Sequence, residues 1–98
     1  MLKVERASKE YAEEYGFNRD NDWFIFKMQE EIGELIQVYL MMTKRGRSKG
    51  LSKEEIRKNF EMEIADLFCS VLLFANHYEI DLMKPIEEKW FKRLIESK

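Results

Sequence analysis

Two short acidic segments have the residue types and the spacing of a metal site. They read Glu-Glu-Ile-Gly-Glu-Leu in residues 30–35 and Glu-Ile-Ala-Asp-Leu in residues 63–67. At about 100° per residue on an α-helix, Glu31 and Glu34 stand about 60° apart on one face. The same spacing of three holds for Glu63 and Asp66. If the two helices pack antiparallel along the edges of these faces, the four carboxylates converge, as a hard divalent cation such as Mg²⁺ requires.

The same acids also have an ordinary interpretation. The chain has 19 acidic residues, so carboxylate pairs at a spacing of three arise without function on solvated or salt-bridged faces. Here the two pairs occupy matching helical angles, apolar residues follow them, and a small residue, Gly33 or Ala65, splits each pair. A glycine inside a helix costs about 1 kcal/mol relative to alanine, which predicts a close backbone approach at Gly33. From the residues alone, the metal site and the solvated face both stay open.

Four helices are predicted to carry and surround these segments. Apolar periodicity predicts them over residues 3–15, about 23–43, about 52–78 and from residue 81 onward. The expected end signals are Gly16 after the first helix, Asn21 or Asp22 before the second, the capping box of Ser52 and Glu55, and Asp81 before the fourth. The third helix is apolar around most of its circumference, so it must be central to a bundle or an oligomer. On the fourth helix, Ile86, Trp90 and Leu94 define the expected inner face.

The composition favours a single all-α domain over residues 1–98. Hydrophobic residues make up 45% and charged residues 37%, with one proline and four glycines, a balance typical of long helices. The net charge of −2, with both signs interspersed, argues against a partner nucleic acid. No membrane is expected either, because the longest apolar run, Leu67 to Ala75, is too short to span a bilayer.

The single cysteine and the first residues bear on where the protein works. Cys69 cannot form an internal disulfide, and the start Met-Leu-Lys-Val-Glu-Arg lacks the apolar stretch of a signal peptide. A cytoplasmic protein is therefore expected.

The spacing of the acids resembles the signature of a known family. Glu-Glu-x-x-Glu at residues 30, 31 and 34, followed by Glu-x-x-Asp at residues 63 and 66, is similar to the motif of the MazG-like, all-α nucleoside triphosphate pyrophosphohydrolases. Their superfamily also includes dimeric dUTPases and dCTP pyrophosphatases. The resemblance extends to Asp81-Leu82, Lys89 and Arg93. It implies an antiparallel helical bundle of about four helices, completed by assembly into a homodimer or a homotetramer.

The resemblance also implies an activity. It is the Mg²⁺-dependent cleavage of an NTP or dNTP substrate between the α and β phosphates, with Mn²⁺ as a substitute ion, which removes unwanted nucleotides as monophosphate and pyrophosphate. Because bare carboxylates would repel a triphosphate, bound Mg²⁺ must reverse the local charge. The implied metal ligands, which position a water for attack, are Glu31, Glu34, Glu63 and Asp66. Glu30 would be an outer ligand or the base that orients this water; the alternative is a surface acid paired with Lys27.

Three further residues are candidates to contact the nucleotide. By the resemblance, Lys89 and Arg93 neutralise the outgoing phosphates, and Trp23 is a candidate for stacking on the base; the alternatives are a solvated helix face and a core aromatic. Many family members have an asparagine between this lysine and arginine, whereas Trp90 follows Lys89 here. The basic loop at residues 44–50 is either a flexible connector or a phosphate-binding segment.

Two competing classes are weighed against this hypothesis. A di-iron carboxylate bundle needs Glu-x-x-His pairs, and His77 lies about 16 Å beyond Asp66 along the predicted helix, so iron is not expected. Cys69 has no histidine near it in sequence and is interpreted as a packing residue. The second class is a non-catalytic helical interaction or nucleotide-binding module. In it the acids are salt-bridged, and the broad apolar faces serve assembly.

Overall fold

The computed structural model describes residues 2–96 and consists of helices and their connections. The elements are α1 (Leu2–Tyr15), α2 (Asn21–Met42), α3 (Lys53–His77), α4 (Met83–Ile86), a π-helical segment η1 (Glu87–Phe91) and α5 (Lys92–Glu96). The last three follow one another without a break and are called the C-terminal helix. The predicted all-α class is confirmed, since residues 2–96 contain four helical segments and no strand.

Two of the predicted helix ends are found as expected. Gly16 follows α1 with a φ of +69°, a left-handed conformation that glycine adopts without strain. At the start of α3, the Ser52 hydroxyl accepts from the Glu55 N–H at 3.1 Å, and the Glu55 carboxylate accepts from the Ser52 N–H at 3.0 Å. This reciprocal pair is the predicted capping box, and it fixes where the acid-bearing helix α3 begins.

The start of α2 was predicted wrongly by one or two residues. Neither Asn21 nor Asp22 is the N-cap, because both lie inside the helix. The cap is Asp20, whose Oδ1 accepts from the Trp23 N–H at 2.8 Å. All three residues are of types that cap helices well, so residue type alone did not distinguish them.

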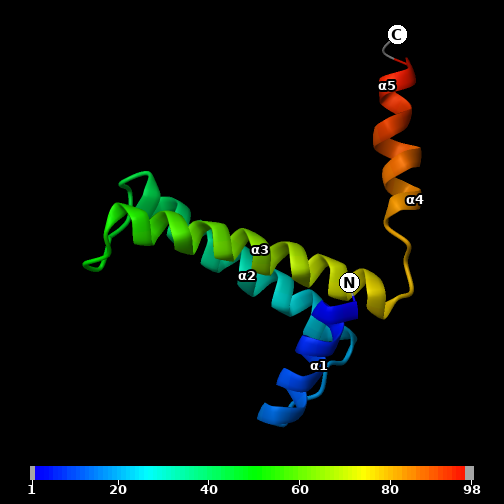
Figure 1. Cartoon of the computed structure of the whole chain (residues 1–98), viewed down its shortest axis with the longest axis horizontal. Coiled ribbons are helices and arrows are strands. Elements are labelled where there is room, and N and C mark those ends of the chain that lie inside the picture. Colours follow the sequence, from blue (N-terminus) through cyan, green and yellow to red (C-terminus); the bar gives the residue numbers. More distant parts are fainter. Residues whose placement is uncertain (1, 97–98) are drawn as a thin grey trace.

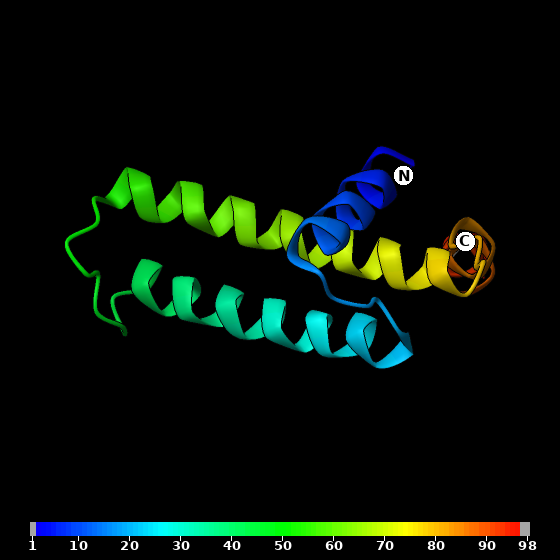
Figure 2. The same cartoon turned by 90° about the horizontal axis from the view of Figure 1, so that it is seen from below.

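Helices α2 and α3 form a hairpin that organises the molecule. They lie side by side and run in opposite directions, joined by the loop 43–52 (Figures 1 and 2). Helix α1 packs across one face of the hairpin, called the inner face, and the C-terminal helix stands off the opposite, outer face (Figure 1). The buried apolar residues are Ala12, Phe24, Ile56, Leu73 and Ala75. The core thus lies between α2 and α3 and beneath α1.

Within residues 2–96, the C-terminal helix has no helical neighbour. Among residues 2–96, its backbone comes close to none of α1, α2 and α3. Trp90 and Leu94, predicted on an inner face, are 61% and 66% exposed. That prediction is wrong for the single chain, because after His77 the chain turns away from the hairpin (Figure 1). The packing of all four helices into one bundle is therefore not present in one protomer.

No helix within residues 2–96 combines the length and the apolar character that crossing a membrane would need.

Candidate metal centre

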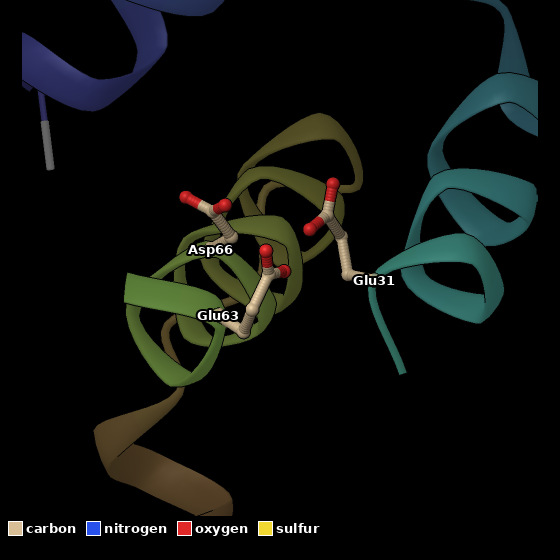
Figure 3. Close-up of side chains that lie close together, drawn as sticks. All are labelled: Glu31, Glu63 and Asp66. Atoms are coloured by element: carbon tan, nitrogen blue, oxygen red, sulfur yellow. The ribbon is translucent and has the colours of Figure 1, made fainter. Parts of the chain in front are cut away.

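Three of the four predicted ligands meet on the inner side of the hairpin. Glu31 from α2 and Glu63 and Asp66 from α3 each offer a carboxylate oxygen, and these three oxygens lie within 4.8 Å of one another. The close-up shows Glu63 and Asp66 projecting from the same side of α3, with Glu31 reaching toward them from α2 (Figure 3). Glu34 adjoins this cluster through Glu63 but is not one of the three. The helical spacing of the acids therefore predicted their convergence, with Glu34 at its edge.

Two oxygens of the cluster are buried without a partner. Glu31 is only 5% exposed. Among the described residues, neither Glu31 Oε2 nor Glu63 Oε2 has a hydrogen-bond partner, and both atoms are inaccessible to solvent. A buried polar atom without a partner is costly and uncommon in folded proteins. Each of these oxygens is therefore open to a proton or a cation.

The pKa values of two acids in the cluster are also shifted by their surroundings. Burial raises the pKa of Glu31, and repulsion from Glu34 and Asp66 raises it further, against the lowering effect of Lys27. Burial also raises the pKa of Glu63, with added repulsion from its acidic neighbours Glu34, Asp66 and Glu31. Both shifts disfavour the ionised carboxylate, first because burial removes it from water and then because the neighbouring carboxylates repel it.

Lys27 supplies part of the missing positive charge. Its Nζ lies 3.3 Å from Glu31 Oε1 and 3.4 Å from Glu30 Oε1. Burial lowers the pKa of Lys27, but the bonds and attraction to Glu31 and Glu30 outweigh this and raise it overall. Glu30 is exposed and lies outside the cluster, so the structure has the alternative arrangement, a surface acid paired with Lys27.

A cavity of about 450 Å³ opens beside the cluster, between α1 and the hairpin. Its lining includes Glu31 and Asp66 from the cluster, Lys27 and Trp23 from α2, and Tyr11 from α1. Cavities of roughly 300–1,000 Å³ with apolar walls and a few polar groups are typical of small-molecule sites. The predicted candidate Trp23 thus lies at this cavity, with its ring also stacked on Phe17 at 5.5 Å between centroids.

Two sets of predicted residues lie elsewhere. Lys89 and Arg93 are on the C-terminal helix, whose backbone is remote from α2 and α3 within residues 2–96, so one chain does not bring them to the acids. Gly33 was expected to allow a close backbone approach. That prediction is wrong, because among the described residues nothing lies within 4 Å of a Cβ built on Gly33. Gly33 is exposed on α2.

The cavity wall supplied by α1 was missed in the sequence. Ser8 and Tyr11 line the cavity, and the apolar stripe of α1 indicated only that this helix packs somewhere. The position of Lys27 four residues before Glu31 was a usable signal, because side chains at that spacing meet on a helix.

The donor set fits a hard divalent cation. The cluster offers carboxylate oxygens alone, which suit Mg²⁺, Mn²⁺ or Ca²⁺ better than softer metals. His77 is not part of it. Its Nε2 bonds to the Asn21 Oδ1 at the end of the hairpin, away from the acids. Within residues 2–96, Glu31 Oε2 and Glu63 Oε2 are buried and accept no hydrogen bond.

Comparisons with protein-family models, with curated proteins and with solved structures found no match to this chain. The resemblance to the MazG-like pyrophosphohydrolases therefore rests on the acidic motif of the sequence alone.

Proposed function

We propose that this protein is a Mg²⁺-dependent nucleoside triphosphate pyrophosphohydrolase. The observation that carries the proposal is the meeting of Glu31, Glu63 and Asp66 beside an aromatic-lined cavity, with two of their oxygens buried and unpartnered. If the acids formed only a solvated or salt-bridged face, their carboxylates would contact water or the side chains of lysine and arginine. The reaction joins a water oxygen to the α-phosphorus and breaks its bond to the bridging oxygen of the β phosphate, releasing monophosphate and pyrophosphate.

The roles of the acids follow from their positions. Glu31, Glu63 and Asp66 would hold the cation, and Glu34, which adjoins Glu63, would complete or orient the set. When bound, the ion would neutralise triphosphate charge and lower the pKa of a coordinated water. Glu30 is exposed, pairs with Lys27 and lies outside the three-acid cluster, and its proposed place is in the outer shell.

The proposed binding place for the rest of the substrate is the cavity beside the acids. Trp23 and Tyr11 offer aromatic surfaces for a base, and Lys27 offers a positive charge between them and the acids. Lys89 and Arg93 would contact the phosphates only if a second copy of the chain brought its C-terminal helix to the site. The proposed working form is therefore a homo-oligomer.

A second candidate is a non-catalytic helical module. The ion pair between Lys27 and Glu31 favours it, because a salt-bridged acid needs no metal. This pair uses Glu31 Oε1 and leaves Oε2 without a partner, and it leaves Glu63 untouched. The enzyme hypothesis therefore explains more features of the acid cluster than the module hypothesis does.

The test is pyrophosphate release from a panel of canonical and modified NTPs and dNTPs, with Mg²⁺ and with EDTA. The proposal expects release of pyrophosphate together with the matching monophosphate, abolished by EDTA. Silence across the panel, in protein shown to be folded and at its native oligomeric state, would favour the non-catalytic module. Nucleotide titration followed by calorimetry would then distinguish a binding module from one that ignores nucleotides.

A further inference from the structure

A second cavity lies at the loop end of the hairpin, away from the acid cluster. Its volume is about 400 Å³, and it is lined by residues from the end of α2, the loop 43–52 and the start of α3: Met41, Met42, Lys44, Ser48, Lys53, Ile56 and Arg57. Met41 lies ten residues beyond Glu31, which is about 15 Å along α2. This loop is at the opposite end of the hairpin from the C-terminal helix (Figures 1 and 2). The cavity is therefore separate from the candidate metal centre.

The apolar part of the lining is flexible and not aromatic. Ile56 is one of the buried core residues, at 7% exposure, and Met41 and Met42 are half-buried at the end of α2. Methionine side chains are unbranched, so they adapt to apolar groups of different shapes. Among the described residues, no aromatic ring lines this cavity. These walls suit a hydrocarbon chain better than a nucleotide base.

The polar part of the lining is positively charged. Lys44, Lys53 and Arg57 line the cavity, and no acidic residue is among the described residues that do so. Arg57 is partly compensated, because its Nε lies 3.3 Å from Glu61 Oε2. Within residues 2–96, neither Lys44 nor Lys53 forms an ion pair with an acid. The two lysines therefore give the cavity a positive charge that an anion can neutralise.

The surrounding segment concentrates this charge in a chain that is acidic as a whole. Residues 43–58 contain seven basic and two acidic residues, whereas the net charge of the chain is −2. Both acids of this segment lie outside the cavity lining, and one of them, Glu55, is bound in the capping box with Ser52. Arg45 is also engaged, because its Nε donates to Thr43 Oγ1 at 3.0 Å and its guanidinium lies over the Tyr39 ring.

The connecting loop is held in place by backbone hydrogen bonds. The Leu40 carbonyl oxygen accepts from the N–H groups of Arg45 at 2.8 Å and of Gly46 at 3.0 Å. The Ser48 carbonyl oxygen accepts from the Leu51 N–H at 3.0 Å. A Cβ built on Gly46 would lie 3.3 Å from the Leu40 Cβ, so the loop packs closely on the end of α2. A cavity that is formed in advance lowers the entropic cost of ordering on binding.

We propose that this cavity binds a small aliphatic anion, which is a molecule with a short hydrocarbon chain and one carboxylate or phosphate head group. The chain contacts the two methionines and Ile56, and the head group pairs with Lys44 and Lys53. The Ser48 hydroxyl is the hydrogen-bond donor for the same head group. This site shares no residue with the acid cluster or with the cavity beside it, so the inference holds whether or not the protein hydrolyses nucleotides.

Nuclear magnetic resonance of the full chain, with carbon-13 in the methionine methyl groups, tests the site. The probes are octanoate and octyl phosphate, each kept below its micelle concentration, with hexanoate as the shorter analogue. We expect saturable shifts of the Met41 and Met42 signals. Octanoate should bind about 15-fold more tightly than hexanoate, because each buried methylene contributes about a factor of four. The internal control is Met62, which is 54% exposed outside this cavity and should not respond.

The outcomes of this titration are distinct. Saturation of the Met41 shift by either probe supports the site, and the tighter probe identifies the head group. Equal affinity for hexanoate and octanoate, or an equal response of Met62, would indicate adsorption to any exposed apolar surface and would overturn the proposal. Binding of a single-stranded oligonucleotide, with no response to either probe, would overturn it too and assign the basic segment to phosphate backbones.

A double substitution tests the contact with the head group. Lys44→Gln combined with Lys53→Gln is expected to raise the octanoate dissociation constant about 3- to 10-fold at about 0.15 M salt, because exposed charge pairs are weak and partly screened. The matched control combines Lys9→Gln with Lys58→Gln, which removes the same charge from exposed residues outside the lining and should change affinity less than twofold. Equal affinity of the two double variants would overturn the assignment of the lysines. If the first is unfolded by circular dichroism, Lys53→Gln alone replaces it, with Lys58→Gln as its control.

Discussion

The inner and outer faces of the α2–α3 hairpin are separated by a single residue step, yet they have opposite chemistry. Glu31 and Glu63 point inward to the acid cluster, and the next residues, Ile32 and Ile64, are exposed on the outer face. One residue turns a helix by about 100°, so alternating chemistry along the chain becomes two different surfaces. The inner face has carboxylates, which are stabilised by a positive charge. The outer face has apolar side chains, which are stabilised by burial. A charged surface and an apolar surface are thereby separated on the same two helices.

The largest effect on activity is expected when one acid is removed from the inner face. Glu63→Gln is expected to lower pyrophosphate release by about 10²- to 10³-fold, the size typical for loss of one electrostatic stabiliser in an active site. Asp66→Asn is expected to act alike, since its carboxylate belongs to the same cluster. The measurement is steady-state hydrolysis of the best substrate with saturating Mg²⁺.

The control for that loss is Glu61→Gln, two residues earlier on α3. Glu61 is exposed and pairs with Arg57 at 3.3 Å, a surface contact of small energetic effect. Its activity should stay within a factor of two of the wild type. An active Asp66→Asn variant would exclude the proposed enzyme.

Metal binding should also change thermal stability, and with a defined pH dependence. The pKa values of Glu31 and Glu63 are raised above their ordinary value of 4.5. The folded protein therefore holds their protons to higher pH than the unfolded chain does. The stability that these groups contribute is full below pH 4.5 and is lost as pH rises through the raised values. In EDTA, the melting temperature of the wild type minus that of Glu63→Gln should fall as pH increases.

Adding Mg²⁺ at neutral pH should reverse this loss. At about 100 times its dissociation constant, an ion that binds only the folded state adds about 2.7 kcal/mol of stability. For a domain of this size that raises the melting temperature by about 10–20 °C. Differential scanning calorimetry at constant protein concentration would measure it. An identical melting temperature with Mg²⁺ and with EDTA would contradict the metal site.

Lys27 tests how much of the inner-face charge is already compensated. Lys27→Gln removes the cation that lies 3.3 Å from Glu31, so a divalent ion no longer competes with it. We expect Mg²⁺ affinity to rise by about 1.5- to 5-fold, in line with the energies of partly exposed ion pairs. Calorimetric Mg²⁺ titration would measure the change, with Lys58→Gln on the exposed surface of α3 as the control. Weaker Mg²⁺ binding in Lys27→Gln would mean that Lys27 positions Glu31 for the ion.

The smallest expected effect is an unchanged Mg²⁺ affinity when the outer face is altered. This result would show directly that the two faces act independently. Glu31, Glu63 and Asp66 come from one chain, so the proposed ion site takes these three carboxylates from a single protomer. Phe68→Glu, which changes an exposed apolar side chain outside the acid cluster, should therefore keep the Mg²⁺ affinity of the wild type within a factor of two. Hydrolysis by this variant is measured in the same samples, since a loss of activity with intact Mg²⁺ binding would point to groups supplied by a second copy of the chain.

The part of the molecule that could be predicted from the sequence is the part with strict helical periodicity. The spacing of Glu31, Glu63 and Asp66 required one face on each helix, and packing those faces placed the carboxylates together. The capping box at Ser52 and the glycine after α1 followed from local hydrogen bonding, which acts within four residues. These features depend on residues that are close together in the chain, so they can be predicted from the sequence.

The rest depends on contacts between distant segments. An apolar stripe shows that α1 packs but not on which face, so the cavity wall at Tyr11 was missed. The same limit explains the C-terminal helix, where Trp90 has an inner face only if another molecule supplies one. For Gly33, its low helix propensity was taken as a sign of close packing, and the structure has open space there.

The order of the helices along the chain has a consequence for the rate of folding. Helices α2 and α3 are consecutive and joined by the loop 43–52, so they pair through a short loop closure, which is faster than pairing distant segments. During synthesis, Glu31 meets Glu63 and Asp66 once residues up to about 77 are available, before the C-terminal helix exists. If ionised carboxylates must approach one another in that step, a divalent cation lowers its barrier. We expect Mg²⁺ to accelerate refolding as well as to stabilise the folded protein.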